Sequence, residues 1–253
     1  MIIDFPKNSN IPSLKALWKE AFQDTDEFID LFFSLAFSEE NSLAVYDNGE
    51  LAASLYWFDG KVGDGKAAYI YGVATKKAQR GKGYSTSLLK KCHELLSDKG
   101  YSAAILVPAD KELFNFYGRL GYNECCFIEL DEVVASKEKV AFKEISAEEY
   151  LTQRNNYLPQ NSLIFDNKRL HFLASITDFY KGDSFIFAKS KDTDTLRIIE
   201  FFGSENLLSS VIGSLGFSSA TVRRYGKSKP FAMYLSLEKN FCTVPEYLGF
   251  AFD

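Results

Sequence analysis

A basic loop that contains two glycines follows an apolar run in the first half of the chain. The run, residues 69–73 (YIYGV), has the composition of a buried strand, and the loop covers residues 76–83. An amphipathic helix is predicted to begin near Tyr84. A strand, a glycine loop and a helix in this order present several backbone N–H groups to a phosphate at the helix N-terminus. Arg80 and Lys82 add positive charge, so the sequence predicts a phosphate-binding site here.

Two widespread phosphate-binding patterns do not match this stretch. The dinucleotide fingerprint needs G-x-G-x-x-G after a strand, but Thr86 stands where the third glycine after Gly81 and Gly83 would be. The Walker A pattern needs G-x-x-x-x-G-K-[ST], and no such string occurs in the chain. The loop therefore belongs to another kind of phosphate site, or it is an ordinary solvated basic turn.

The loop resembles the acyl-CoA signature of the GNAT superfamily of N-acetyltransferases, [QR]-x-x-G-x-[GA]. The string Arg80-Gly81-Lys82-Gly83-Tyr84-Ser85 fits this signature, except that Ser85 stands where glycine or alanine is usual. Lys77 is a second departure, because proline is common at its place. The string Gly72-Val73-Ala74-Thr75 is similar to the strand that precedes this loop in many members. The resemblance covers residues 1–131 and implies a mixed α/β sheet with the GNAT acyl-CoA N-acyltransferase fold.

This resemblance also implies acetyl-CoA as the acyl donor, and no metal ion. In the family, backbone N–H groups of the loop hold the pyrophosphate, and the exposed edge of the preceding strand pairs with the pantetheine arm. A backbone N–H of that strand faces the thioester oxygen, and here we expect that of Val73. The cofactor-binding residues expected on this basis are Val73, Thr75, Arg80, Gly81, Lys82, Gly83, Tyr84, Ser85 and Asn115.

A second stretch, residues 113–122, resembles the family's signature F-Y-x-x-x-G-[FY]. On this resemblance Tyr117 is the general acid that protonates the CoA sulfur, and Asn115 lies against the pantetheine. A phenol has a pKa of about 10, close to that of a leaving thiol, which makes the assignment chemically sound. Tyr117 and Val73 are the expected catalytic residues. The alternative for Tyr117 is a tyrosine at the edge of the core on an amphipathic helix.

The general base is open at this stage. Some relatives place a glutamate on the central strand, but residues 66–75 contain no carboxylate. Tyr69 or Tyr71 could hold a water that relays the proton, or a carboxylate could come from elsewhere. The chain ends in an apolar, strand-like stretch, residues 247–253, and in some two-domain relatives the C-terminal carboxylate enters the active site. Tyr69, Tyr71 and Asp253 are therefore the residues expected on the acceptor side.

Composition narrows the class of protein. The chain has 253 residues, of which 46% are apolar and 25% charged, as in ordinary globular proteins. Its net charge of −5 argues against a general nucleic-acid binder. The four cysteines form no C-x-x-C pair, and His93 and His171 are far apart, so we expect no zinc site. We expect His93 on a solvated flank of its helix.

Targeting signals and membrane spans are absent from the sequence pattern. The first residues lack the basic region and long apolar core of a signal peptide, and no apolar run approaches spanning length. We therefore expect a cytoplasmic protein.

The elements expected around the site follow the GNAT order, β-α-α-β-β-β-α-β-α-β. The strand that carries residues 67–75 should lie at the centre, after a hairpin that turns at Asp47-Asn48-Gly49. The other elements expected here are a strand at 2–5, helices at 12–22, 26–37, 85–99 and 111–120, and strands at 102–107 and 122–130.

The second half should form a smaller α+β domain that resembles a degenerate GNAT half. We expect a charged, strand-poor linker over residues 131–139 and a helix at 167–180. The other expected elements are helices at 146–156 and 205–215 and strands at 183–188, 196–202, 220–225 and 231–237. Aligning Asn41-Ser42-Leu43 with Asp183-Ser184-Phe185 suggests a weak internal repeat. The alternative is an unrelated α+β domain.

The domains expected from this division are a catalytic domain at 1–131, a linker at 132–140, and a second domain at 141–253 that completes the acceptor site. Because no glycine loop recurs in the second half, we expect it not to bind CoA.

The function expected from the sequence is acetyl transfer from acetyl-CoA to a primary amine of a small molecule or aminoacyl group, by direct attack on the thioester. Two alternatives stay open: a catalytically silent CoA-binding sensor or interaction protein, and an acyltransferase that uses a longer acyl-CoA. We expect no nucleic-acid or membrane partner, and either a monomer or a homodimer.

Overall fold

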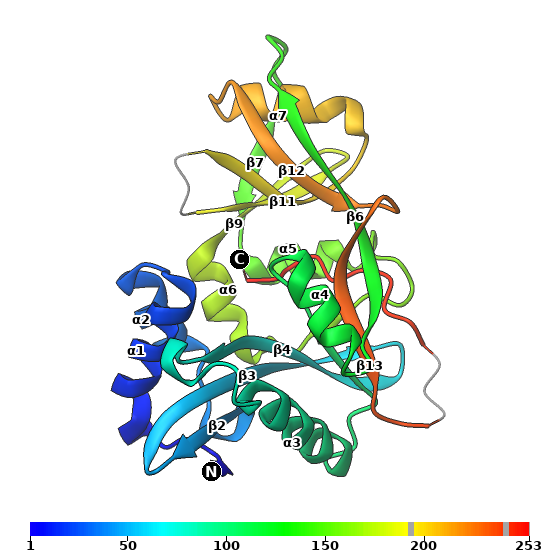
Figure 1. The fold of residues 1–253 in the computed structure, drawn as a ribbon. Helices are drawn as coiled ribbons and strands as arrows, with labels where there is room; N and C mark the ends of the chain where they lie inside the picture. The colour runs from blue at the N-terminus through cyan, green and yellow to red at the C-terminus, as the bar shows by residue number, and fades with distance from the viewer. Residues whose placement is uncertain (192–194, 240–242, 253) are drawn as a thin grey trace. The chain divides into compact units, whose positions relative to one another are not determined.

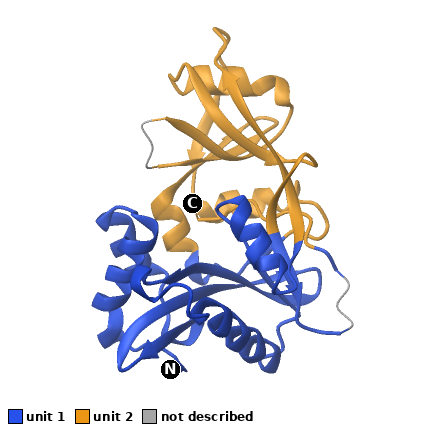
Figure 2. Cartoon of the chain, viewed as in Figure 1, with its two compact units in different colours: residues 1–123, 163–169, 233–244 blue, residues 124–162, 170–232, 245–253 orange. Residues whose placement is uncertain are grey.

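The chain forms two compact units in the computed structural model, which describes residues 1–191, 195–239 and 243–252 (Figure 2). Unit 1 comprises residues 1–123, 163–169 and 233–244, and unit 2 comprises residues 124–162, 170–232 and 245–253. The two units are therefore interleaved along the sequence. The continuous domain ranges 1–131, 132–140 and 141–253 stay a prediction.

Unit 1 follows the element order expected for the first half of the chain (Figure 1). Its elements are β1 (Ile2–Asp4), η1 (Asn8–Asn10), α1 (Ile11–Phe22), α2 (Asp26–Leu35), η2 (Glu39–Asn41), β2 (Ser42–Asp47), β3 (Glu50–Val62), β4 (Gly65–Thr75), η3 (Lys77–Gln79), α3 (Tyr84–Asp98), β5 (Ala103–Leu106), α4 (Lys111–Gly118), β8 (Ile164–Phe165), η4 (Asn167–Arg169) and the last residues of β13 (Lys229–Ser236).

Local sequence signals explain how the first elements begin and end. Pro12 stands in the first turn of α1, where its missing N–H has no intrahelical acceptor to lose. Helix α2 begins where Thr25 Oγ1 accepts a hydrogen bond from the Phe28 N–H at 3.2 Å. Asn48 and Gly49 turn the β2–β3 hairpin with φ values of 51° and 82°. The predicted hairpin is confirmed.

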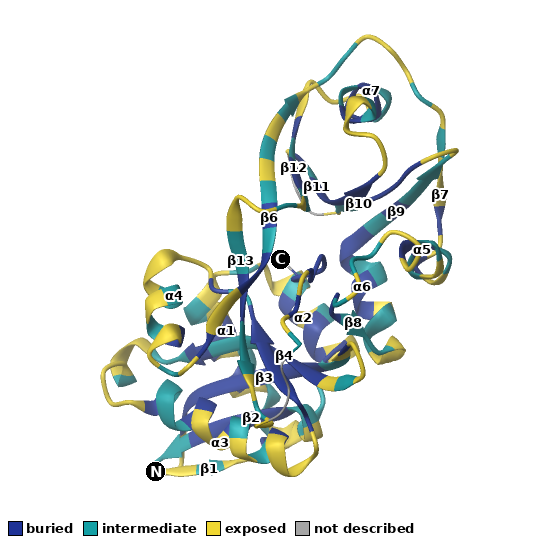
Figure 3. Ribbon diagram, turned by 90° about the vertical axis from the view of Figure 1, so that its right-hand side faces the viewer, coloured by how far each residue is buried: buried dark blue, intermediate teal, exposed yellow. Residues whose placement is uncertain are grey.

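The strands of unit 1 lie in the order β1-β2-β3-β4-β5-β13, and β8 pairs with β3. Neighbouring strands are antiparallel except for β4 and β5, which are parallel. Strand β3 is buried over residues 51–58, so both faces of the sheet are covered at its centre (Figure 3).

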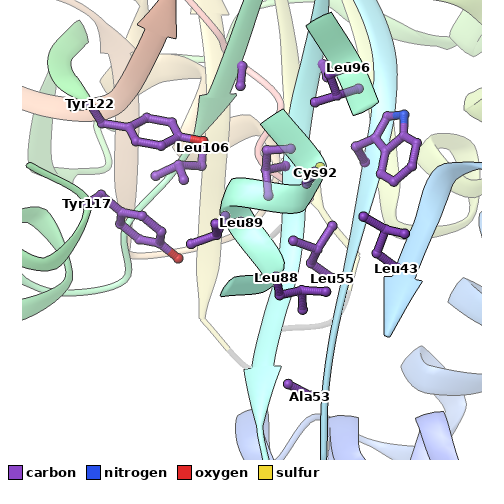
Figure 4. Close-up of a cluster of buried hydrophobic side chains, with 14 of the residues drawn as sticks. Leu43, Ala53, Leu55, Leu88, Leu89, Cys92, Leu96, Leu106, Tyr117 and Tyr122 are labelled. Carbon is purple, nitrogen blue, oxygen red and sulfur yellow. The ribbon is translucent and has the colours of Figure 1, made fainter. Parts of the chain in front are cut away.

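Helix α3 covers one face of this sheet. Leu88, Leu89, Cys92 and Leu96 of α3 are fully buried and belong to a core that also contains Leu55 of β3 (Figure 4). Truncating a buried leucine to alanine typically costs about 2–5 kcal/mol. Since the N-terminus of α3 follows the glycine loop, this packing also fixes the position of the loop.

Aromatic rings cover the opposite face, where α1 packs against the sheet. The ring centroid of Trp18 lies 4.4 Å from that of Phe32, 5.5 Å from that of Tyr56 and 5.6 Å from that of Tyr71. Tyr56 and Leu55 are neighbours on β3 and therefore point to opposite faces.

Unit 2 has its own group of strands and its own core. Its strands lie in the order β6-β12-β11-β10-β9-β7. Its elements are β6 (Asn123–Val134), β7 (Phe142–Ile145), α5 (Ala147–Arg154), α6 (Leu170–Ile176), β9 (Thr177–Gly182), β10 (Ile186–Ser190), β11 (Leu196–Phe202), η5 (Glu205–Leu207), α7 (Leu208–Ser214), β12 (Ser219–Tyr225) and the first residues of β13. The core side chains come mainly from β10, β11, β12 and α7.

Three predictions for the second half are wrong. Residues 177–180, predicted as the end of a helix, belong to β9, because α6 ends at Ile176. Residues 131–134, predicted as part of a strand-poor linker, continue β6 and pair with β12. The C-terminal stretch, predicted as strand-like, contains only an isolated bridge between Ser162 and Tyr247 within its described residues.

The two units share one topology. The order β7-β9-β10-β11-β12 of unit 2 repeats the order β1-β2-β3-β4-β5 of unit 1, with antiparallel pairs followed by one parallel pair. A helix connects the parallel strands in each unit, α3 in unit 1 and α7 in unit 2. The predicted second, smaller α+β half of the same type is confirmed in its topology.

The sequence alignment expected for this repeat is displaced by one strand. Residues 41–43 lead into β2, and residues 183–185 lead into β10. By strand order, however, the counterpart of β2 is β9. Strands of similar apolar composition follow one another at short spacing, so the sequence alignment matched β2 with β10 instead of β9.

Candidate functional site

The candidate site begins where β4 and β5 separate. Strand β5 pairs with β4 only over residues 103–105, whereas β4 continues past Tyr69 to Thr75. Strand β5 ends at Leu106, and the chain then turns into α4. The edge of β4 beyond Tyr69 is therefore not paired by β5. An exposed strand edge of this kind can hydrogen-bond to an extended ligand.

A β-bulge interrupts β4 just beyond this point of separation. Gly72 and Val73 together oppose a single residue of β3, Leu55. Gly72 has a φ of +59°, and a Cβ there would come within 3.0 Å of Trp18 and Tyr56. Glycine combines this φ with this close packing without strain. The bulge takes Val73 out of the regular ladder with β3.

The loop after β4 is open above its two glycines. Gly81 and Gly83 have φ values of +80° and +79°, and a Cβ at either would meet nothing within 4 Å. Gly83 is the N-cap of α3, and among the described residues no side chain caps this helix. Its first turn also carries no acidic residue. The first N–H groups of α3 therefore lack intrahelical acceptors and suit an anion.

Two of the four cations in this loop, Arg80 and Lys82, make contacts within the protein while they remain exposed to solvent. Lys82 Nζ donates to Gln79 Oε1 at 2.6 Å and lies 4.0 Å from the Asp47 carboxylate. Arg80 Nε donates to the Thr75 carbonyl oxygen at 3.4 Å. Both cations are exposed. An anion above the loop can therefore attract either side chain away from its present partner.

The side chains of the first two residues of α3 are held by the protein itself. Tyr84 Oη donates to Asp47 Oδ2 at 2.7 Å, so the backbone N–H is the part of Tyr84 that remains for a ligand. Ser85 Oγ and Thr75 Oγ1 lie 2.7 Å apart and share a hydrogen bond. This bond ties the first turn of α3 to the end of β4. It also gives a physical reason for a serine where glycine or alanine is usual.

Tyr117 lies on α4 at the edge of the α3-side core. Its side chain is 6% exposed, and its ring packs edge-on against Phe116 and Tyr122 at centroid distances of 5.1 and 5.7 Å. Burial, together with the charge of Asp110, raises the pKa of Tyr117 to about 12. Val73 packs against the same core cluster.

Asn115 is exposed on the same helix. Helix α4 begins at Asp110, whose Oδ1 accepts a hydrogen bond from the Leu113 N–H at 2.8 Å. Residues two apart on a helix point in nearly opposite directions, so Asn115 and Tyr117 occupy different faces of α4. The expected contact of Asn115 with the pantetheine stays a prediction.

His93 corrects one prediction, because it does not lie on a solvated flank of α3. It is half-buried, and its Nε2 lies 2.8 Å from Tyr122 Oη. Burial lowers the pKa of His93 to about 4, so the imidazole is neutral at physiological pH. His93 supports Tyr122, which in turn packs against Tyr117.

Tyr69 and Tyr71 lie on the aromatic face of the sheet rather than on the α3 face. Tyr69 is buried and Tyr71 half-buried, and their ring centroids are 6.0 Å apart. Phe165 of β8 lies 5.6 Å from Tyr69, and Phe58 of β3 lies 5.4 Å from Tyr71. The third expected acceptor-side residue, Asp253, lies outside the described residues.

Other features of the chain add no chemistry to this site. In the part of the chain that the structure describes, no group of histidine, cysteine and acidic residues could hold a metal ion. Cys92, Cys125 and Cys126 are buried free thiols, and Cys242 lies outside the described residues. No helix among residues 1–191, 195–239 and 243–252 is long and apolar enough to cross a membrane.

The sequence interpretation missed two features of this site. An isolated glycine within a strand pattern indicates a bulge, and Gly72 was such a signal. The bond between Thr75 and Ser85 had no comparable signal, because it joins residues on either side of the loop.

Comparison with known proteins now adds to this geometry. Residues 3–125 match the family model described as "Acetyltransferase (GNAT) domain". No curated protein sequence matches the chain. The fold is similar to that of a GCN5-related N-acetyltransferase from Anabaena variabilis ATCC 29413, at 16% identity and a TM-score of 0.71, over 94% of this chain and 73% of that one.

Two further solved structures are similar over most of the chain. A GCN5-related N-acetyltransferase from Kribbella flavida has 14% identity and a TM-score of 0.68, over 92% of this chain and 70% of its own. Eis1 from Mycobacterium abscessus has 10% identity and a TM-score of 0.67, over 94% of this chain and 74% of its own. At these identities the likeness concerns the fold alone.

Proposed function

We propose, because residues 3–125 match the GNAT acetyltransferase domain model, that this chain is an acetyl-CoA-dependent N-acetyltransferase. Its acceptor is the primary amine of a small molecule or of an aminoacyl group. The observation that carries the proposal is the open loop at Gly81 and Gly83, which lies between the unpaired edge of β4 and the uncapped N-terminus of α3.

The residues of this loop fit the donor's charged end. The diphosphate of acetyl-CoA would lie on the N–H groups of residues 80–85, where the helix dipole favours negative charge. Arg80 and Lys82 would exchange their present contacts for phosphate oxygens. The pantetheine arm, which carries amide groups, would pair with the edge of β4 up to Thr75, as an added strand pairs with a sheet edge.

The transfer step needs one proton acceptor and one proton donor. The acceptor nitrogen attacks the thioester carbonyl carbon, and the C–S bond breaks as the new C–N bond is completed. The Val73 N–H donates a hydrogen bond to the carbonyl oxygen while negative charge develops there. Tyr117 gives its phenolic proton to the departing sulfur. Burial raises the pKa of Tyr117 to about 12, so the phenol is protonated at neutral pH and available as a donor, although it is then a weaker acid than the thiol it forms.

The proton of the attacking amine has three proposed routes. Tyr69 or Tyr71 would hold a water that carries the proton away, or a carboxylate of Asp253 would accept it. A chain that lacks Phe252 and Asp253 distinguishes these routes. If the carboxylate is the base, turnover falls while acetyl-CoA binding persists; unchanged turnover would leave the tyrosine routes.

The proposal is tested first by calorimetric titration of the full chain with acetyl-CoA. Gly83→Glu should weaken binding by at least about tenfold, because it adds negative charge beside the diphosphate and a side chain at positive φ. Gly100→Glu is the matched control. Gly100 has a φ of +74°, meets nothing within 4 Å and lies just past the other end of α3, so this variant should bind as the parent does.

Thiol release in the presence of a panel of amines then tests the reaction itself. Absence of binding to a folded parent would reject the proposal. Binding without thiol release from any amine would favour the silent CoA-binding protein, and faster release from longer acyl-CoA donors would favour the other alternative.

A further inference from the structure

Strands β11 and β12 of unit 2 separate in the same way as β4 and β5 of unit 1. Their parallel pairing joins residues 196–198 to residues 220–222, and β11 then continues to Phe202. Strand β11 also carries a bulge at Ile199, directly after the paired residues. Unit 2 has therefore kept both the separation of the strands and the bulge.

Where β11 and β12 separate, two buried arginines, Arg154 and Arg223, donate hydrogen bonds to backbone carbonyl oxygens of residues 245–252. Arg223 Nε donates to the carbonyl oxygen of Ile199 at 3.2 Å, and its Nη2 donates to that of Gly249 at 3.0 Å. Arg154 Nη2 donates to the carbonyl oxygen of Leu248 at 3.3 Å. The guanidinium of Arg223 therefore joins the bulge of β11 to the C-terminal segment, residues 245–252.

A buried ion pair fixes Arg154 in this position. Arg154 Nε and Nη2 donate to the two carboxylate oxygens of Glu200 at 2.7 and 2.8 Å, and the two side chains are 3% and 0% exposed. Tyr150 Oη donates to the same carboxylate at 2.9 Å. A fork of this kind is rigid, so it presents a fixed donor to the Leu248 carbonyl.

Gly249 lies against this ion pair. Its φ is +75°, and a Cβ there would overlap the Glu200 carboxylate and come within 2.5 Å of Arg154 Nη2. Both the conformation and the space therefore select glycine at this place.

Aromatic side chains bury the residues on either side of Gly249. Tyr247 and Phe250 are each 1% exposed, and the guanidinium of Arg154 lies 4.8 Å from the centroid of the Phe250 ring. The ring of Phe252 stacks on that of Phe172 at 5.8 Å. Apart from one isolated bridge, the described residues of this segment belong to no helix or strand (red in Figure 1). The segment is thus held by side chains and carbonyl contacts, as a bound peptide is.

We propose that the separated strands β11 and β12 form a peptide-binding site, and that residues 245–252 of the same chain occupy it. The peptide it takes has an aromatic residue, leucine, glycine and a second aromatic residue in succession, with the leucine and glycine carbonyls accepting from Arg154 and Arg223. This peptide site does not require that the proposed acetyl transfer takes place, although the segment leads to Asp253, which is one of the proposed acceptors of the amine proton. In unit 1 the separated strands β4 and β5 would bind the acyl donor, whereas in unit 2 the separated strands β11 and β12 would bind a peptide.

The chain that leads into the segment offers a place to test this. Lys239 is exposed, and Val244 is 44% exposed. A recognition sequence for a specific protease is placed between these two residues of the full chain, which is then cut. The cut segment should remain bound through gel filtration under native conditions, and an excess of labelled synthetic peptide with the sequence of residues 244–253 should replace it.

Two variant peptides and one protein variant test which contacts hold the segment. A Val244→Ala peptide should enter as well as the parent peptide, whereas a Gly249→Ala peptide should bind at least about tenfold more weakly because of its positive φ alone. Arg223→Lys, which cannot hold both carbonyl oxygens, should release the labelled peptide faster.

Three results would overturn the proposal. The first is a cut segment that stays but never exchanges, and the second is loss of the circular dichroism of unit 2 when the segment leaves. Either would make the segment part of the folded core rather than a ligand. The third is a dimer in which labelled and cut chains fill each other's sites, which would assign the site to a second copy.

Discussion

Units 1 and 2 have the same strand order but differ in the loop that follows their central strand. In unit 1, β4 leads through Gly81 and Gly83 into α3, and the space above both glycines is open. In unit 2, β11 leads through Gly203 into α7. A Cβ at Gly203 would come within 2.5 Å of Phe185, and Glu205 brings a negative charge to the turn.

The same topology therefore carries different chemistry in the two halves of one chain. The strand separation and the bulge occur in both units, so neither by itself makes an acyl-CoA site. An open, basic loop before a long helix occurs only in unit 1 among the regions that the structure describes. Function here depends on the loop and its side chains rather than on the fold.

The largest effect on turnover is expected from a change at Tyr117, and it would show that the reaction takes place in unit 1. Tyr117→Phe removes the proposed proton donor and should lower kcat by about 10²–10⁴, with acetyl-CoA affinity unchanged. Steady-state kinetics and calorimetry measure the two quantities. Tyr157→Phe, at a 41% exposed tyrosine of unit 2, is the control and should have no effect. An equal loss in both variants would contradict the assignment.

Glu200 of β11 tests the contribution of the buried ion pair in unit 2. Glu200→Gln leaves Arg154 buried without its counter-charge and should lower the free energy of unfolding by about 3–5 kcal/mol. Chemical denaturation measures this change. The double variant Arg154→Met/Glu200→Leu should recover most of the loss, because an apolar pair needs no counter-charge. A single variant as stable as the parent would show that the pair contributes little.

Burial of His93 in the core of unit 1 should make the free energy of unfolding depend on pH. Its folded pKa of about 4 lies below the unfolded value, so its neutral form stabilises the protein fully above about pH 6.5. That contribution, roughly 3 kcal/mol, is lost as the pH falls from 6.5 to 4. Denaturation curves at several pH values should show this loss in the parent and a smaller one in His93→Gln. Identical pH profiles would contradict the burial argument.

Ser85 gives the smallest expected effect and sharpens the difference between the two loops. Ser85→Ala removes the hydrogen bond to Thr75 and should lower the free energy of unfolding by about 1 kcal/mol. Acetyl-CoA affinity should change by less than about threefold, because the backbone N–H of residue 85 remains. Thr75→Val should have the same effect on stability. A large loss of affinity in Ser85→Ala alone would mean that its hydroxyl contacts the donor.

The parts of unit 1 that could be predicted carry short-range signals. Asn48-Gly49 specifies a tight hairpin turn, and the glycines of the loop mark the start of α3. These signals act within a few residues, so a single sequence is enough to interpret them. The detailed geometry of the site, such as the hydrogen bond between Thr75 and Ser85, depends on how separate elements pack.

The errors in the second half have equally specific causes. Asp131 and Glu132 were interpreted as part of a charged linker, but they lie on opposite faces of β6, where Glu132 is exposed and Asp131 forms an ion pair with Arg224 of β12. Residues 177–180 extend an apolar run that suits either a strand or a helix. The burial of residues 247–252 depends on Arg154, Glu200 and Arg223, which are remote in sequence, so no local pattern could reveal it.

The last residues of β13 have a consequence for how the protein is made. Residues 233–236 pair with β5, so the sheet of unit 1 is completed by a strand that leaves the ribosome more than one hundred residues after β5. Until then the nascent chain presents one edge of β5 without its partner, and such edges invite pairing with other chains. Fragments that end at residue 131 should therefore aggregate even though they contain the whole loop and α3.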